Sequence, residues 1–122
     1  MKKTINDIPD ENKNGNCYQV AYRYFMSNYF DNPNIRLVHG LVTGRGNIYG
    51  IIYNHAWVED IKNNIVYDMT MPEVFQKVPK DVYYVLGNIK TVFKYDHSQV
   101  IDNSIDFKTY GPWETELLNQ EF

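Results

Sequence analysis

The sequence predicts one α+β domain in which a helix near the amino end is followed by an antiparallel sheet. Three observations support this fold class: apolar residues recur at helical spacing between positions 17 and 29, strand-like segments with short connections follow, and the 122 residues fit a single domain. No repeat or linker divides the chain, so we expect one domain over 1–122. Residues 1–13 are polar and are expected to form a loosely ordered arm.

The predicted helix begins at Cys17. Asn16 is its expected N-cap, and Gln19 follows three residues later as in a variant of the capping box. Residues 31–34, which include a proline, are expected to end it. One face of this helix is apolar and is expected to pack on the sheet; it carries Cys17, Val20, Ala21, Tyr24, Phe25 and Tyr29.

The rest of the chain reads mainly as strands separated by turn-forming residues. Turns are expected at 44–47, 62–64 and 87–88, and the short connections favour antiparallel pairing. The expected strands are 35–43, 49–59, 65–68, 81–86 and 89–95. A helical turn is expected over 72–77, with Pro72 in first position, and short helices over 98–104 and 113–119.

Composition excludes several classes of protein. The formal net charge is −3 and basic residues are scattered, which argues against nucleic-acid binding. No apolar run is long enough to span a membrane, and the basic start of the chain has no apolar segment behind it, so no secretory signal is expected. A single cysteine excludes an internal disulfide and a multi-cysteine metal site. We therefore expect a cytoplasmic protein with a reduced thiol.

Cys17, His55 and Asp68 have the residue types of a cysteine nucleophile triad. In an expected strand, His55 shares a face with Trp57 and Glu59. A four-residue hairpin loop over 60–63 would put Asp68 directly opposite His55 on that face. A loop at 63–64 would move Asp68 along the strand but keep it on the same face.

Each of the three residues would have a distinct role. A helix N-terminus and a neighbouring imidazolium both favour the Cys17 thiolate. His55 would take the thiol proton and return it to a leaving group, and Asp68 would orient the imidazole. The Cys17 backbone N–H is one candidate donor to an oxyanion. Side-chain candidates for the oxyanion or the substrate are Asn14, Asn16, Gln19 and Trp57.

Each residue also has an ordinary structural reading. Cys17 alone would more often be a small buried residue, and His55 and Asp68 alone would be a sheet histidine and a strand-end turn residue. His39 is expected to be structural. A metal site from His39, His55 and Asp68 has no short-spaced ligand pair behind it, so we expect neither metal nor cofactor. Trp57 fits the core or a lid over the His–Asp pair.

Three segments resemble the transglutaminase-like, papain-related superfamily of cysteine hydrolases. They are the Gly-containing turn and cysteine at 15–21, the His-Ala-Trp-Val-Glu strand at 55–59 and the Asp-Met-Thr end at 68–70, where the family usually has Pro in place of Met69. The resemblance implies a papain-like core with Cys17 as nucleophile, His55 as base and Asp68 as orienting residue. Segments 83–87 and 111–113 also resemble small uncharacterised proteins of bacteriophages and mobile elements.

The sequence thus predicts a thiol hydrolase or acyltransferase that acts on an amide, peptide or isopeptide-type bond through a Cys17 acyl-enzyme. The expected partner is a peptide or amide substrate, which could belong to a host protein. One alternative is a peptidoglycan amidase or endopeptidase. The other is a catalytically silent interaction protein on the same scaffold, which the eleven tyrosines allow because tyrosine is favoured at interfaces. The sequence leaves the substrate and the oligomeric state open.

Overall fold

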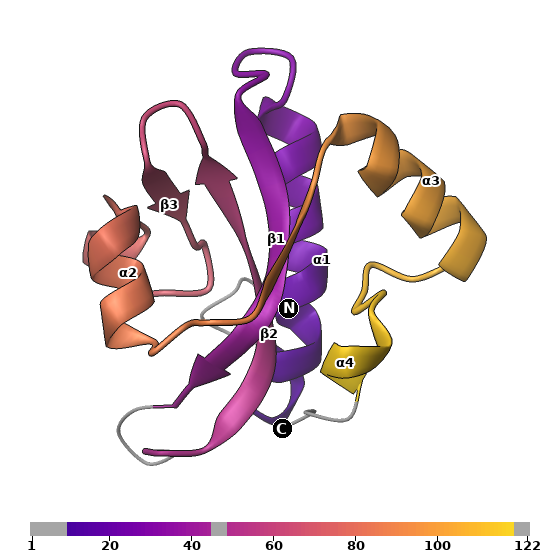
Figure 1. The fold of residues 1–122 in the computed structure, drawn as a ribbon. Coiled ribbons are helices and arrows are strands. Elements are labelled where there is room, and N and C mark those ends of the chain that lie inside the picture. Colours follow the sequence, from indigo (N-terminus) through magenta and orange to yellow (C-terminus); the bar gives the residue numbers. More distant parts are fainter. Residues whose placement is uncertain (1–9, 45–48, 119–122) are drawn as a thin grey trace, which may run out of the picture.

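A computed structural model describes residues 10–44 and 49–118, with side chains from residue 16 onward in the first helix. The described chain is α+β, with a five-stranded antiparallel sheet in the order β4-β3-β2-β1-β5 (Figure 1), so the expected fold class is confirmed at this level. The elements are α1 (Asp10–Asn28), β1 (Ile35–Thr43), β2 (Ile52–Asp60), β3 (Ile65–Tyr67), η3 (Glu73–Phe75), β4 (Lys77–Pro79), α2 (Lys80–Leu86), β5 (Val92–Tyr95), α3 (His97–Phe107) and α4 (Thr115–Leu118).

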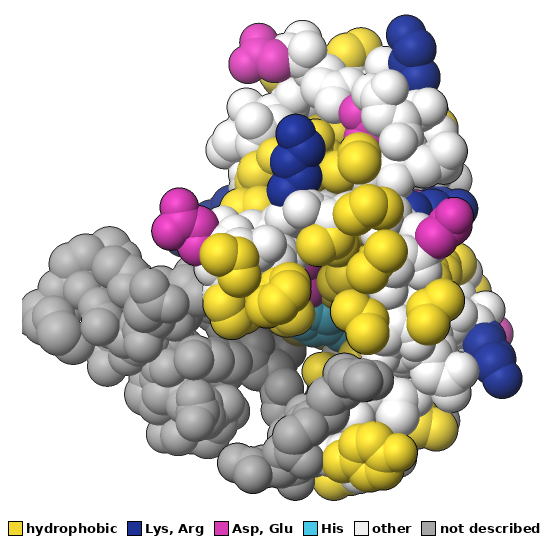
Figure 2. Space-filling model, turned by 90° about the vertical axis from the view of Figure 1, so that its left-hand side faces the viewer, with side chains coloured by type: hydrophobic (Ala, Val, Ile, Leu, Met, Phe, Trp, Pro, Cys, Tyr) yellow, Lys and Arg dark blue, Asp and Glu magenta, His cyan; other side chains and the backbone are white. Residues whose placement is uncertain are grey.

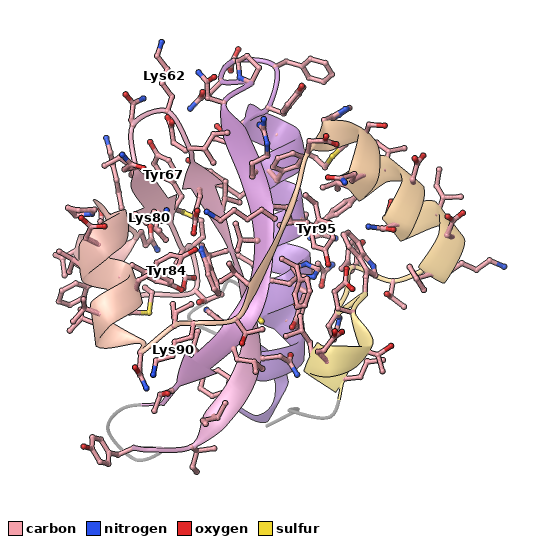
Figure 3. The ribbon with its side chains drawn as sticks, viewed as in Figure 1. Lys62, Tyr67, Lys80, Tyr84, Lys90 and Tyr95 are labelled. Atoms are coloured by element: carbon pink, nitrogen blue, oxygen red, sulfur yellow. The ribbon has the colours of Figure 1, made fainter. Side chains whose placement is uncertain are left out.

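Helices cover both faces of the sheet. Figure 1 shows α1 running along β1 and β2, with α3 and α4 on one side of the molecule and α2 on the other. The two apolar clusters follow the alternation of β2: Ala56 and Val58 belong to the α1 cluster, whereas Trp57 belongs to the α2 cluster. In Figure 3 the side chain of Tyr84 extends from α2, and Tyr95 lies on the side of α3 and α4. The sheet therefore separates two packed layers.

The first helix starts earlier than the sequence predicted. α1 begins at Asp10, so Asn16 is not an N-cap and Cys17 lies in the helix interior. Of the predicted arm, residues 10–13 are helical and residues 1–9 lie outside the described part.

The segment 81–86 is helical, and its prediction as a strand was wrong. Its valines and tyrosines are typical of a strand, but Pro79 precedes α2 as its N-cap residue and Asp81 lies in the first turn. Tyr83 and Tyr84 are half-buried and both reach acidic side chains of the sheet, so tertiary contacts outweigh β-propensity here. The strand β4 at Lys77–Pro79 was not predicted.

The remaining elements differ from expectation mainly in length. β1 has the predicted bounds, β2 begins at Ile52, and β5 begins at Val92. The predicted turn at 72–77 is the shorter η3, with Pro72 as its N-cap residue. α3 is longer than predicted because Asp96 forms a capping box with Gln99, and α4 is shorter. The predicted turn at 44–47 lies mostly outside the described residues.

The hairpin between β2 and β3 is shifted by one residue from the predicted loop. Asp60 pairs with Ile65, which leaves the loop at 61–64. The Asp60 carboxylate holds this loop because it accepts from the backbone N–H of Lys62 at 3.0 Å and that of Asn63 at 2.9 Å. Asn64 closes the loop with a positive φ of 57°, a conformation that asparagine tolerates. The register that follows places Asp68 level with Trp57, still on the face of His55.

We expect Asp60→Ala to destabilise the fold. The change removes an acceptor that also receives a hydrogen bond from Asn32 Nδ2 at 3.0 Å. The free energy of unfolding should fall by about 1–3 kcal/mol, measured by urea denaturation. Lys62→Ala in the same loop is the control, because its side chain is exposed. Equal effects of the two substitutions would contradict the role of the carboxylate.

Candidate active site

The Asp68 carboxylate is the best-connected polar group of the site. Its Oδ2 accepts from His55 Nε2 at 2.9 Å and from the Tyr83 hydroxyl at 2.6 Å. Its Oδ1 accepts from the backbone N–H of Thr70 at 3.0 Å and from the Thr70 hydroxyl at 2.6 Å. Asp68 is only 2% exposed, so these four hydrogen bonds replace its hydration. The carboxylate is thereby fixed in one orientation toward His55.

The early end of β3 places Asp68. β3 stops pairing with β2 at Tyr67, whereas on the β4 side the pairing continues through the backbone N–H of Asp68, which donates to Gln76 O at 2.9 Å. The chain after Tyr67 therefore leaves β2. The part of β2 around Ala56 loses its neighbour on this side, so side chains from the two faces of the sheet can meet at that edge.

Cys17 meets His55 at this edge. It lies on α1, which packs on the face of Ala56, whereas His55 points to the face of Trp57. A side-chain hydrogen bond nevertheless joins Cys17 and His55. Since Nε2 of the imidazole is bound to Asp68, Nδ1 is the ring nitrogen left for the thiol. The structure thus brings Cys17, His55 and Asp68 into one chain of hydrogen bonds.

Electrostatics favour an imidazolium beside the Asp68 carboxylate. Burial lowers the pKa of His55, but the Asp68 carboxylate and Cys17 together raise it well above its ordinary value. Burial raises the pKa of Asp68, but the charge of His55 and hydrogen bonds from His55, Thr70 and Tyr83 hold it below its ordinary value. Both shifts favour the ion pair over its neutral form.

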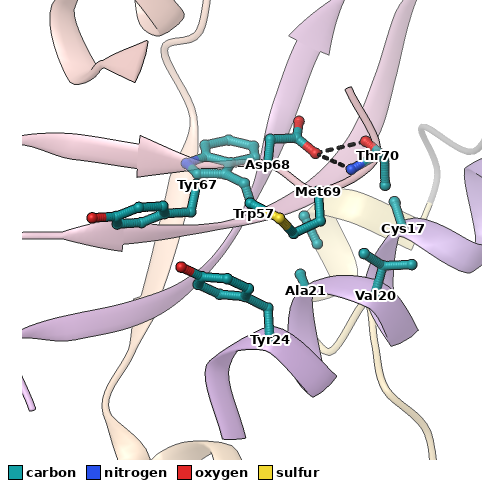
Figure 4. A pocket seen from close by; sticks show the side chains of 10 residues that line it. Cys17, Val20, Ala21, Tyr24, Trp57, Tyr67, Asp68, Met69 and Thr70 are labelled. Atoms are coloured by element: carbon teal, nitrogen blue, oxygen red, sulfur yellow. Dashed lines mark hydrogen bonds between the residues drawn. The ribbon is translucent and has the colours of Figure 1, made fainter. Parts of the chain in front are cut away.

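The thiol lies under a closed surface. Cys17 is 1% exposed and lines a narrow gap between α1 and the segment after β3 (Figure 4). The gap leaves about 0 Å³ for a water-sized sphere, so a water molecule does not fit between the side chains there. Figure 4 shows Val20, Ala21 and Tyr24 along α1, facing Met69 and the hydrogen bonds between Asp68 and Thr70.

None of the predicted oxyanion donors is established. The interior position of Cys17 commits its backbone N–H to the helix, so that donor was predicted wrongly. Gln19 and Asn16 are half-buried on α1, one or two positions from Cys17, which points them away from its face. The indole N–H of Trp57 donates to Glu59 Oε2 at 2.9 Å, so Trp57 packs as core. The side chain of Asn14 lies outside the described part.

His39 has the structural place that the sequence predicted. It is fully buried, with its ring 4.7 Å from that of Tyr18 and 4.9 Å from that of Trp113. Burial lowers its pKa to about 3, so the ring is neutral. A Cβ on Gly111 would lie 2.5 Å from its Cε1 carbon, which explains a glycine there. Among the described residues no cluster of His, Cys, Asp or Glu could hold a metal ion.

Sequence reasoning missed Tyr83 and Thr70 as partners of Asp68. Thr70 was part of the matching Asp-Met-Thr segment, and a threonine two residues after an aspartate is a common turn partner, so a signal existed. For Tyr83 the sequence held no such signal, because its segment was predicted as a strand. Its hydroxyl reaches Asp68 only because residues 80–86 are helical.

The comparisons with known proteins give no relative. No family model matches the chain, and neither the curated proteins nor the solved structures include a significant match. In the described residues, no helix combines the length and apolar character needed to cross a membrane. The function is therefore inferred from the geometry of the site.

We expect Asp68→Asn to lower the pKa of His55, because the substitution removes the nearby negative charge. The His55 ring signals in an NMR titration measure this change. His39 is the internal reference, since it lies in the other layer and its pKa is set by burial. An unchanged His55 titration would contradict the ion pair.

The stability difference between wild type and Asp68→Asn should also depend on pH. Asp68 contributes its full stabilisation of the folded state above its ordinary pKa of 3.8. This stabilisation is lost as the pH drops through the lowered pKa of the folded state. His55 contributes its full stabilisation of the folded state below its ordinary pKa of 6.5. This stabilisation is lost as the pH rises through the raised pKa of the folded state. The difference should therefore be largest between these two values, at about 3 kcal/mol. Urea denaturation across pH measures it, and a flat difference would contradict the linkage.

Proposed function

We propose that this chain is a cysteine-dependent hydrolase or acyltransferase that acts on an amide, peptide or isopeptide-type bond. The observation that supports the proposal is the position of His55, which is hydrogen-bonded to Asp68 through Nε2 at 2.9 Å and also to Cys17. A thiol, an imidazole and a buried carboxylate in this order are the parts of a nucleophile, a base and an orienting group.

The reaction would proceed in two steps. His55 holds the proton of the Cys17 thiol as an imidazolium, and the sulfur attacks the carbonyl carbon of the substrate. The carbon–nitrogen bond then breaks, and the leaving amine takes the proton from His55. In the second step His55 removes a proton from water or from an acceptor amine, which attacks the thioester. The acyl group leaves as an acid or a new amide, and the proton stays on His55 beside the released sulfur. Asp68 keeps the imidazole oriented throughout.

The scaffold that we propose is papain-like. A helix that carries the cysteine packs on an antiparallel sheet, a central strand carries the histidine, and the aspartate follows the next strand along the chain. This arrangement supports the resemblance of segments 15–21, 55–59 and 68–70 to the transglutaminase-like superfamily. The proposed substrate is a peptide or protein amide in the cytoplasm, in which a free thiol persists.

Burial of the thiol favours a second candidate, a catalytically silent binding protein on the same scaffold. With Cys17 only 1% exposed, a substrate carbonyl reaches the sulfur only if the segment around Met69 and Thr70 moves away from α1. An enzyme requires this opening, whereas a binding protein does not. The reactivity of the thiol in the folded protein separates the two candidates.

The test is the rate at which iodoacetamide labels the folded protein, followed by mass spectrometry. We expect labelling of wild type at one site, none in Cys17→Ala, and a rate about 100-fold lower in His55→Ala, since a positioned base contributes at least this much. His97→Ala is a control histidine variant, because His97 begins α3 and stacks on Tyr29, away from the site.

Two results would decide against the enzyme. One is a labelling rate that is equally slow in wild type and His55→Ala. The other is labelling that becomes fast only when urea unfolds both proteins. Either would favour the silent binding protein, because the thiol would then behave as a buried core residue.

A further inference from the structure

A second, larger cavity lies on the α2 side of the sheet, next to His55 and Asp68. Its volume is about 290 Å³. His55, Asp68 and Tyr83 form one end of it, and most of the remaining lining is apolar, contributed by Val42, Tyr53, Met71, Leu86 and Ile89. Unlike the closed gap above Cys17, this cavity has room for a ligand group.

The polar side chains at one end of the cavity are already hydrogen-bonded to one another. His55 donates to Asp68, and Tyr83 donates to the same carboxylate. These groups therefore offer a ligand little unpaired charge. A charged ligand group would lose its hydration here without gaining a partner, whereas an apolar group would gain from leaving water.

The cavity is large enough for only one group of a ligand. Pockets that enclose a whole drug-sized ligand have volumes of about 300–1,000 Å³. At about 290 Å³ this cavity is at the lower limit. It fits one branched aliphatic or aromatic side chain, or an acyl chain of similar size, better than an extended ligand.

The rim of the cavity is apolar as well. Figure 2 shows hydrophobic side chains gathered on this face around a histidine. α2, which contributes Tyr83 and Leu86 to the lining, and the η3 turn also expose large apolar side chains, among them Val74, Phe75 and Val82. These residues would contact the groups that flank the one inside the cavity.

We propose that this cavity binds a bulky aliphatic or aromatic side chain of the substrate, next to the bond that is cleaved. The inference rests on the proposed function, since it names the substrate class of that site: peptides or acyl amides with a large apolar group beside the reacting carbonyl. The bound group would cover the His55–Asp68 pair from water and so strengthen their interaction.

The first test measures binding without turnover. The Cys17→Ala protein, labelled with ¹³C at its methyl groups, is titrated with N-acetylphenylalaninamide and with N-acetylglycinamide. We expect the phenylalanine compound to shift the methyl signals of Val42, Leu86 and Ile89, and the glycine compound to leave them unchanged. Shifts confined to other methyl groups, or no shifts, would overturn the proposal.

A matched pair of variants locates the ligand. Leu86→Asp places a charge in the cavity wall and should abolish the shifts of Val42 and Ile89. Val85→Asp places the same charge one residue earlier on α2, where the side chain is 77% exposed and does not line the cavity, and should preserve them. Equal effects of the two variants would overturn the assignment of the cavity.

The second test uses wild type and a fluorogenic library of acyl-dipeptide amides with different residues beside the scissile bond. We expect kcat/KM for leucine or phenylalanine to exceed that for glycine by at least about tenfold, the effect of one methylene in an apolar pocket. Turnover without this preference would overturn the cavity assignment and keep the proposed function. Methyl shifts without turnover of any substrate would keep the cavity as an apolar ligand site and overturn the proposed function.

Discussion

The candidate site depends on the Asp68 carboxylate. Its hydrogen bonds tie together β2 through His55, α2 through Tyr83 and the segment after β3 through Thr70. An unpaired carboxylate so deeply buried would strongly destabilise the fold. The same hydrogen bonds that satisfy it also set the direction of the imidazole. Structural and chemical requirements therefore coincide in one side chain.

The edge of β2 explains why a helix residue and a residue of the opposite sheet face can meet. A longer β3 would continue to pair with β2 past Ala56 and would separate Cys17 from His55. The hairpin therefore has to release the chain after Tyr67. The Asp60 carboxylate, which fixes the loop at 61–64, sets the register that determines where this release occurs.

Much of the site was predictable from the sequence because it depends on alternation. The face shared by His55 and Asp68 survives a shift of the hairpin loop, since any shift that preserves parity keeps both on one side. The start of α1, the helical state of 80–86 and the role of Tyr83 were not predictable in this way. They depend on proline positions and on contacts with distant acidic groups, which a local pattern of apolar residues does not record. The access route to the thiol likewise depends on packing between α1 and the segment 67–70.

His39 illustrates a different consequence of burial. Its ring is enclosed by Tyr18, Tyr95 and Trp113, and neither ring nitrogen has a hydrogen-bond partner among the described residues. In the unfolded chain the His39 imidazole would bind a proton below its ordinary pKa of 6.5. In the folded chain it would stay neutral down to about pH 3. Each pH unit between these values favours unfolding by about 1.4 kcal/mol. This aromatic enclosure thus sets an acid limit on the stability of the folded protein, independent of any chemistry at Cys17.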